Sequence, residues 1–408
     1  MAKDDVIISL DIGSNSVHGI IAQYDNNLNK FDILSAKTIS APNGIKDGVI
    51  IGIEEATNAV SNLISSLEKE QNKKATRILT AVRGGLVSAF GDKADIRMPE
   101  NDMEVRQDTI DELHDKIRNS RLLDDKHEIV EIIPKEYIID RQDGIFNPIG
   151  MTCKDLELQA LVVAVTQSNI ANIRKSVEYD TDLFYGYTTL AEMLIPEDDK
   201  DGCVLMDIGA TTIGIVVYSD KKIQTAFEID NNCGSELITR DIVKKLRVTQ
   251  KTAKEIKEQY GSVFCDDSQD VTFEYNPMGT NTQTQTYTKK QLSEIIKLEI
   301  DYIIDHIHKY FKMKGVEVDM LSGGIILTGA GSKLDGMAKA MEQGFNCVAK
   351  IVNFNDDENI IVKDEVVDSQ VYTTAISVLL KGYKTNPAKK TRKSSIFGKI
   401  KQFIDDSF

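Results

Sequence analysis

The chain has 408 residues, more than the about 250–300 at which a single hydrophobic core stops growing, so at least two domains are expected. Acidic residues (64) outnumber basic ones (49), and the formal charge of −15 argues against nucleic acid as a partner. No apolar run approaches the ~18 residues of a membrane-spanning helix. A strand-like run begins almost at once after Met1, which leaves no room for a signal peptide and predicts a cytosolic body. Five scattered cysteines without a CxxC pair predict buried thiols.

The strongest pattern along the chain is an internal repeat of two hairpins. Residues 6–21 read VIISLDIGSNSVHGII and residues 203–217 read CVLMDIGATTIGIVV. Each is an apolar strand, then Asp-Ile-Gly, then small polar residues and a second apolar strand. Asp11 matches Asp207 and Gly13 matches Gly209, at an offset of 207 − 11 = 196 residues. This domain-sized offset predicts two lobes of like construction.

Strand and helix patterns alternate after each hairpin, which predicts α/β lobes. Helical apolar spacing covers 54–69 and 169–177, and a strand is expected over 78–82. Between about 84 and 159 the sequence pattern changes. It predicts a charged helix, a strand and a turn-rich stretch, which we interpret as an inserted small domain. A polar tract over 265–290 predicts a sheet excursion or loops.

The last residues differ from everything before them. A Pro break at Asn386-Pro387 ends the preceding helix. The tail that follows is basic: Lys389, Lys390, Arg392, Lys393 and Lys399. On a helical wheel its large apolar residues fall within an arc of about 120°: Ile396, Phe397, Ile400, Phe403 and Ile404. Such a helix can dock on the protein's own body, but the basic cluster favours an anionic membrane surface.

The paired Asp-Ile-Gly turns predict a polyphosphate site. A strand that ends in Asp-x-Gly exposes backbone N–H groups at a tight turn, where phosphate oxygens bind. Asp11 and Asp207 are also placed to hold Mg²⁺ through water, since Mg²⁺ prefers a few carboxylates and keeps most of its waters. The residues expected at the two turns are Asp11, Gly13, Ser14, Asn15, Ser16, Asp207, Gly209, Ala210, Thr211 and Thr212.

A third glycine turn suits a nucleoside. Gly329, Ala330, Gly331 and Ser332 follow an apolar strand and precede a helix expected over 335–343, and glycine allows the backbone to approach a flat ligand closely. A weaker signal comes from Gly234, Ser235 and Glu236, which open another helix and offer its N-terminus and one carboxylate.

Three motifs in this order, DIGSNS at 11–16, DIGATT at 207–212 and LTGAGS at 327–332, resemble the phosphate and adenosine loops of the actin/Hsp70/sugar-kinase superfamily. Over nearly its whole length the chain is similar to the bacterial cell-division actin family FtsA. The resemblance implies an α/β, two-lobed actin-like fold with duplicated ATPase domains. Its parts would be a first lobe (1–83 and 160–188, with 374–385 returning to it), an inserted α/β domain (84–159), a second lobe (189–373, with a subdomain at about 231–300), a basic linker (386–394) and an amphipathic membrane-targeting helix (395–408).

The resemblance also implies a function. Members of the family bind ATP with Mg²⁺, form filaments of their own, anchor the FtsZ ring to the cytoplasmic face of the membrane at the division site, and recruit later division proteins through the inserted domain. Asp207 would be the catalytic residue. Hydrolysis would be slow at most, because Thr211 stands where relatives have glycine and no glutamine lies near Tyr185-Gly186-Tyr187. The alternatives are an ATP-dependent phosphotransferase or chaperone of the same fold, and a pilus-assembly or plasmid-segregation actin.

Overall fold

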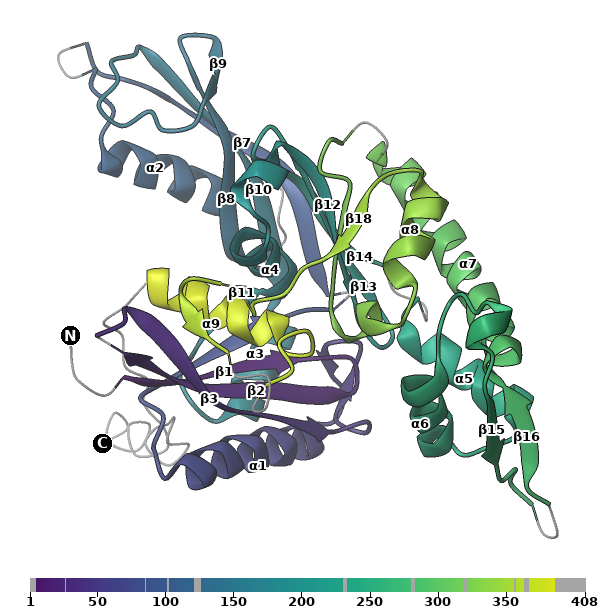
Figure 1. Ribbon diagram of the computed structural model, residues 1–408. Helices are drawn as coiled ribbons and strands as arrows, with labels where there is room; N and C mark the ends of the chain where they lie inside the picture. Colours follow the sequence, from purple (N-terminus) through teal and green to yellow (C-terminus); the bar gives the residue numbers. More distant parts are fainter. Residues whose placement is uncertain are drawn as a thin grey trace.

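The computed structural model describes residues 5–25, 27–84, 86–100, 103–120, 126–229, 233–279, 283–318, 321–355, 357–362 and 367–385. These residues form two lobes side by side, with a smaller domain projecting from the first (Figure 1). The membrane tail predicted from the sequence, residues 386–408, lies outside the described residues. Within the described part of the chain, no helix is long and apolar enough to cross a membrane.

The first lobe is built on a six-stranded sheet in the order β11-β6-β1-β2-β3-β19. Its strands are β1 (Val6–Ile12), β2 (Ser16–Asp25), β3 (Lys30–Ser40), β6 (Arg77–Val82), β11 (Thr181–Tyr185) and β19 (Ile360–Ile361). Helices α1 (Ile53–Gln71) and α3 (Gln167–Val177) cover one face, and α4 (Gly186–Leu194) and α9 (Thr373–Thr385) cover the other (Figure 1). A short hairpin of β4 (Ile45–Lys46) and β5 (Val49–Ile50) precedes α1.

Both faces of β1 are buried, which explains why its sequence is an almost continuous apolar run. Ile8, Leu10 and Ile12 belong to the core under α1, and Ile7 belongs to the core under α4 and α9. Since side chains alternate along a strand, Asp11 shares the second face with Ile7. The strand therefore delivers one carboxylate to the side of the sheet that faces the other lobe.

The second lobe repeats this arrangement in a five-stranded sheet ordered β14-β13-β12-β17-β18. Its strands are β12 (Gly202–Ile208), β13 (Ile213–Ser219), β14 (Lys222–Ile229), β17 (Ile325–Thr328) and β18 (Ala349–Ile351). The predicted repeat is matched in register. Asp11 pairs with His18 in the first hairpin, and Asp207 pairs with Gly214 in the second, where both positions are offset by 196 residues.

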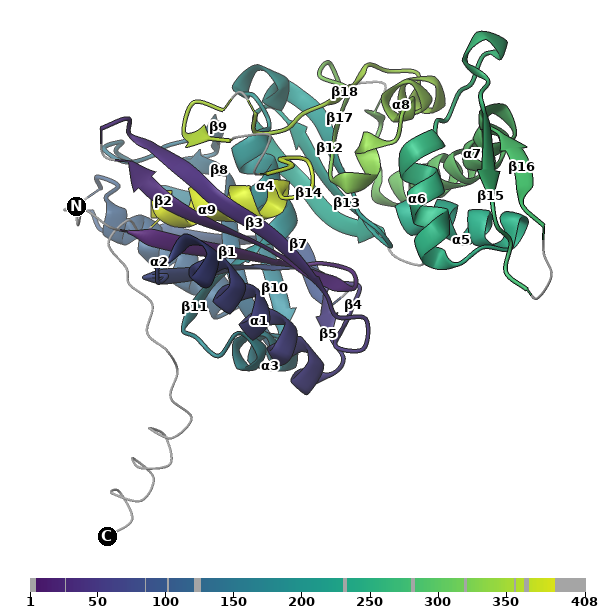
Figure 2. The same cartoon turned by 60° about the horizontal axis from the view of Figure 1, so that its bottom comes forward.

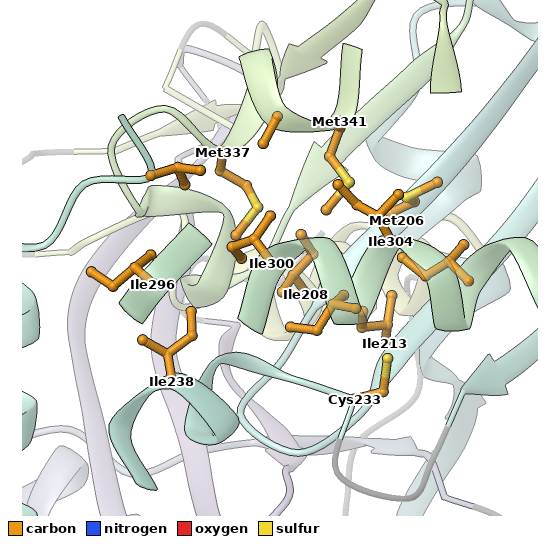
Figure 3. Packing of buried hydrophobic residues seen from close by; sticks show 14 of the residues in the cluster. Met206, Ile208, Ile213, Cys233, Ile238, Ile296, Ile300, Ile304, Met337 and Met341 are labelled. Carbon is orange, nitrogen blue, oxygen red and sulfur yellow. The ribbon is translucent and has the colours of Figure 1, made fainter. Parts of the chain in front are cut away.

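Helices α7 (Lys289–Lys314) and α8 (Met337–Phe345) cover the outer face of this second sheet. Figure 3 shows their apolar side chains interleaved with those of β12 and β13. The inner face of the same sheet packs against α4, so that Leu205 and Val216 share one buried cluster with Ile7 and Tyr187 of the first lobe. The two lobes therefore meet through a continuous apolar core.

The inserted domain is a four-stranded sheet, β7-β10-β8-β9, with a helix packed against it. Its elements are β7 (Val87–Arg97), α2 (Gln107–Arg118), β8 (His127–Ile139), β9 (Gln142–Ile145) and β10 (Asp155–Thr166). Strand β10 reaches from this domain into the first lobe, because its far residues Leu161 and Val163 join the core between the lobes. The domain is thus continuous with the lobe that carries it.

The outer end of the second lobe carries α5 (Ser235–Leu246), α6 (Gln250–Tyr260) and a two-stranded sheet beside them (Figure 2). The sheet consists of β15 (Thr272–Tyr275) and β16 (Gln285–Thr288). This sheet lies within the polar tract over 265–290, for which the sequence predicts either a sheet excursion or loops. The sheet excursion is the correct interpretation.

Two sequence predictions were wrong in detail. The helix expected from Asp335 begins at Met337, because Gly336 stands at a φ of 82° that helical residues do not adopt. The cysteines are free, but only Cys153, Cys203 and Cys233 are buried, while Cys265 and Cys347 are partly exposed. The last two lie in the peripheral segments after α6 and α8, where less of the chain covers them.

The packing between the two lobes predicts that position 214 must be glycine. A Cβ atom there would lie 2.0 and 2.1 Å from two ring atoms of Tyr187, a residue 1 % exposed. We expect Gly214→Ala to lower the free energy of unfolding by about 1–3 kcal/mol, since the ring cannot retreat without shifting α4. Urea unfolding measures this loss.

The matched control is Gly91→Ala in β7, where a Cβ atom would meet nothing within 4 Å. This variant should keep the parental stability to within about 0.5 kcal/mol. Equal stability of the two variants would contradict the packing seen between the lobes.

Candidate functional site

A cavity of about 1070 Å³ lies between the lobes and is lined by all three glycine turns. The predicted residues found on its wall are Asp11, Gly13, Ser14, Asn15, Ser16, Asp207, Gly209, Ala210, Thr212, Ser235, Glu236, Gly329, Ala330 and Gly331. Segments more than 300 residues apart in the chain thus meet around one space. Such a concave site with convergent backbone and polar groups is typical of a small-molecule site.

The first two turns are built alike. The N–H of Gly13 donates to the carbonyl of Ser16 at 2.9 Å, and the N–H of Gly209 donates to that of Thr212 at 3.0 Å. The two bonds are again related by the offset of 196 residues. Each one closes a tight turn at the end of a buried strand and brings the neighbouring backbone to the cavity wall.

Three of the predicted site residues lie behind the wall of the cavity. The Thr211 hydroxyl donates to a carboxylate oxygen of Asp47, which ties the second turn to the first lobe. Gly234 packs against the second turn, where a Cβ atom would lie 2.4 Å from the carbonyl oxygen of Ala210. Ser332 is buried, and its hydroxyl donates to the Gly329 carbonyl at 2.7 Å. These residues shape the turns and do not line the cavity.

The N-terminus of α5 holds the second turn in place. The N–H groups of Ser235 and Glu236 donate to the carbonyls of Gly209 and Ala210, at 3.0 and 2.7 Å. The first N–H groups of a helix have no partner within the helix, and here the turn supplies one. These two donors are therefore engaged with the protein's own backbone.

The third turn comes close to the second-lobe carboxylate. Gly329 has a φ of 82°, and a Cβ atom on it would lie 2.2 Å from Oδ1 of Asp207. Gly331 is packed as tightly, because its Cβ atom would lie 2.4 Å from Cγ2 of Ile208. Glycine at both positions lets the third turn approach the end of β12 and complete the cavity.

At the centre of the site a single guanidinium joins the two lobes. Nε of Arg83 lies 2.9 Å from Oδ1 of Asp11, and Nη1 lies 2.9 Å from Oδ2 of Asp207. The side chains are 12, 8 and 4 % exposed, respectively. Burial by itself would lower the pKa of Arg83, but the two carboxylates together raise it above its ordinary value. The arginine therefore stays charged.

The contacts among Arg83, Asp11 and Asp207 also affect the Mg²⁺ site that the sequence predicts at the two aspartates. Burial raises the pKa of Asp207, and the Arg83 charge opposes that shift. The carboxylate oxygens expected to hold Mg²⁺ through water face a guanidinium instead. Among the described residues, no group of three or more histidine, cysteine, aspartate or glutamate side chains could hold a metal ion. With one oxygen of each aspartate paired to Arg83, the side-chain geometry does not fit a divalent cation shared by Asp11 and Asp207.

Next to the arginine lies a buried tyrosine–carboxylate pair. The Tyr187 hydroxyl donates to Oε2 of Glu228, and the Arg83 guanidinium lies 5.1 Å from the centre of the Tyr187 ring. Burial raises the pKa of Glu228 to about 7, against the hydrogen bond from Tyr187, which lowers it. Tyr187 is the second residue of α4, the helix at whose start the sequence has no glutamine.

Sequence reasoning missed Arg83, Tyr187 and Glu228. A signal for the arginine exists in the internal repeat. Ala81 of β6 pairs with Asp11, as Thr328 of β17 pairs with Asp207, and the residues two positions later are Arg83 and Ala330. Extending the repeat from the hairpins to the next parallel strand would have placed position 83 at the cavity.

The chain matches two family models. Residues 204–377 match the one described as cell division protein FtsA. Residues 84–164 match the one described as the SHS2 domain inserted in FtsA, and this range contains most of the four-stranded sheet.

Curated relatives and solved structures agree with these matches. Cell division protein FtsA of Neisseria meningitidis is 26 % identical over 416 residues, which covers 98 % of both chains. That of Streptococcus pneumoniae is 25 % identical over 357 residues, 86 % of this chain and 76 % of the relative. The PilM–PilN type IV pilus biogenesis complex has a TM-score of 0.63 at 14 % identity, covering 92 % of this chain and 98 % of that one. MreB5 of Spiroplasma citri bound to ADP has a TM-score of 0.51 at 14 % identity, covering 93 and 96 %. The two structures establish an actin-like fold.

The raised pKa of Glu228 predicts a pH-dependent cost in stability. The unfolded chain loses this proton near pH ~4.3, and the folded protein keeps it up to about pH 7. Its contribution to the free energy of unfolding therefore falls as the pH rises between these values and is constant above them. Glu228→Gln removes this titration and leaves an amide oxygen to accept from Tyr187.

Relative to the parent protein, Glu228→Gln should gain up to about 3 kcal/mol in the free energy of unfolding between pH 5 and 8. Urea unfolding of the nucleotide-free protein at several pH values measures the gain. Glu100→Gln, at an exposed position, is the control. A difference between Glu228→Gln and the parent that does not change with pH would contradict the assignment.

Proposed function

Because the chain belongs to the FtsA family of cell division proteins, we propose that it is a nucleotide-binding, self-associating actin homologue that anchors the FtsZ ring to the cytoplasmic face of the membrane at the division site. The observation that carries the proposal is the meeting of three glycine turns in one cavity of a chain whose whole length resembles this family. In this role the protein acts mainly as an adaptor, and any enzymatic activity is secondary.

The proposed ligand is ATP. The first two turns would hold the polyphosphate through their backbone, and the third turn would hold the nucleoside, since glycine lets the backbone approach a flat ligand. Crystal structures of MreB5, which has the same fold, contain ADP in one case and AMPPNP in the other. A nucleotide enclosed between the lobes would contact both of them, so its binding would affect both.

Hydrolysis would be slow at most. Asp207 is the carboxylate nearest to the role of a catalytic base, but one of its oxygens is already paired with the Arg83 guanidinium. The first turn of α4 carries Tyr187 and no glutamine that could position a water. The Tyr187 hydroxyl is not free for that task, because it already donates to Glu228. Nucleotide would therefore act mainly as a ligand that sets conformation and assembly.

Attachment to the membrane would come from the tail. The sequence of residues 395–408 places five large apolar side chains on one side of a helix, behind a run of lysine and arginine. A single helix of this kind binds an anionic surface reversibly, by apolar insertion and by electrostatic attraction. The inserted domain would contact a neighbouring subunit or later division proteins, and FtsZ would be the ring partner.

Placing a negative charge on the third turn tests the nucleotide site. Ala330 is exposed at the cavity wall, so Ala330→Glu should fold normally. It should weaken binding of a fluorescent ATP analogue by at least about tenfold, or ~1.4 kcal/mol, through repulsion and bulk. Ser322→Glu makes the same charge change at an exposed position before the start of β17 and should leave the affinity unchanged. Equal affinities of both variants and the parent would refute this site.

A charge on the apolar side of the tail tests membrane attachment. Phe403→Glu should reduce co-sedimentation with vesicles of anionic lipid by about tenfold or more, because burying a large apolar side chain is worth ~1.5–3 kcal/mol. Gln402→Glu changes the charge equally on the polar side and should bind as the parent does. Binding by the parent should weaken as salt is added. If Phe403→Glu sediments as well as the parent, the tail docks on the body instead.

A further inference from the structure

Arg83 occupies the position between the carboxylates at the ends of the two equivalent strands. Its contacts with Asp11 of β1 and Asp207 of β12 are both 2.9 Å long, and they reach across from one lobe to the other. All three side chains are nearly buried. A cation at this point neutralises charge that would otherwise face the phosphates of a nucleotide.

Each of the three guanidinium nitrogens of Arg83 contacts a protein side chain. Its remaining terminal nitrogen, Nη2, donates to the Thr374 hydroxyl of α9, and its plane lies near the ring of Tyr187. The stem packs against the start of α4, where a Cβ atom on Gly186 would lie 3.1 Å from Cγ of Arg83. The chain after it is fixed by Gly84, at a φ of 98°. Arg83 is therefore built into the site and does not swing as a surface arginine would.

A divalent cation at the same carboxylate oxygens would have to displace this arginine. Mg²⁺ takes oxygen ligands or waters held by carboxylates, and each oxygen that it engages is lost to the guanidinium. Removing both carboxylate partners would leave a buried cation uncompensated, which costs several kcal/mol. The structure offers Arg83 no other carboxylate at ion-pair distance among the described residues.

The arginine also faces the ligand space. Arg83 lines the same cavity as Gly13, Ser14 and Gly209 of the two phosphate turns. A guanidinium presents several N–H donors in a plane, and these match phosphate oxygens as well as carboxylates. The chain thus presents a buried cation at the wall of this cavity.

We propose that the Arg83 guanidinium takes the place of the divalent cation at Asp11 and Asp207, so that this chain binds the polyphosphate of a nucleotide without Mg²⁺ held by these carboxylates. The inference rests on the proposed nucleotide site and specifies how that site is charged. It replaces the metal role that the sequence predicts for the two aspartates.

The test is a titration of the full chain with a fluorescent ATP analogue, in excess MgCl₂ and in excess EDTA. The parent protein should bind with affinities that agree within about threefold in the two conditions. Arg83→Ala should lose at least about tenfold in EDTA, the worth of a charge-assisted hydrogen bond, and should recover part of the loss in MgCl₂, because the freed carboxylates can then hold the metal. Arg97→Ala, at an exposed arginine of β7, should behave as the parent does.

Each result has a defined meaning. A parent protein that loses more than about tenfold in EDTA overturns the inference while leaving the nucleotide site intact. An Arg83→Ala variant that binds like the parent in EDTA overturns it as well. A parent that binds in neither condition removes the proposed nucleotide site and this inference together. Thermal unfolding shows whether Arg83→Ala is folded, and if it is not, Arg83→Lys and the parent with and without Mg²⁺ decide the outcome.

Discussion

The site depends on one constraint, the apolar contact between the two lobes. Asp11 and Asp207 lie at the ends of strands in different sheets, so their separation is set by whatever holds those sheets together. Helices α4 and α9 lie between the sheets, and their side chains join residues of both in one buried cluster. With that packing fixed, a single arginine can reach both carboxylates. The ion pairs contribute charge complementarity at a place that the apolar core has already defined.

Much of the fold could be predicted from the sequence, because the pattern that encodes each hairpin is local and occurs twice in the chain. An apolar run followed by Asp-Ile-Gly predicts a strand and a tight turn, and its recurrence 196 residues later predicts the second lobe, which the register of the hairpins matches. The repeat, extended to β6, would place position 83 at the cavity, but it does not predict that the arginine there is buried and paired. An arginine beside a glycine at the end of a strand is most often solvated, and its burial here arises from Thr374, Tyr187 and Asp207, which are far away in the chain.

Small errors in the helix and site predictions have the same origin. The start of α8 depends on the backbone angle of Gly336, which composition does not reveal. Thr211 and Ser332 carry side chains that suit a ligand, yet both hydroxyls donate to the protein itself. Whether a polar group at a turn faces the ligand or the scaffold is decided by its neighbours in space. A turn motif therefore identifies the backbone of a site more safely than its side chains.

The inserted domain begins directly after the arginine. Only Gly84 to Leu86 separate Arg83 from β7, and β8 of the same domain contacts the second lobe where the Lys135 ammonium donates to the Gln224 carbonyl at 2.6 Å. Strand β7 has 11 residues, so it is about 35 Å long. A rotation of about 5° at its base displaces its far end by about 3 Å. A small rotation at the arginine end of β7 would therefore be amplified along the strand into a larger displacement at the far end of the inserted domain.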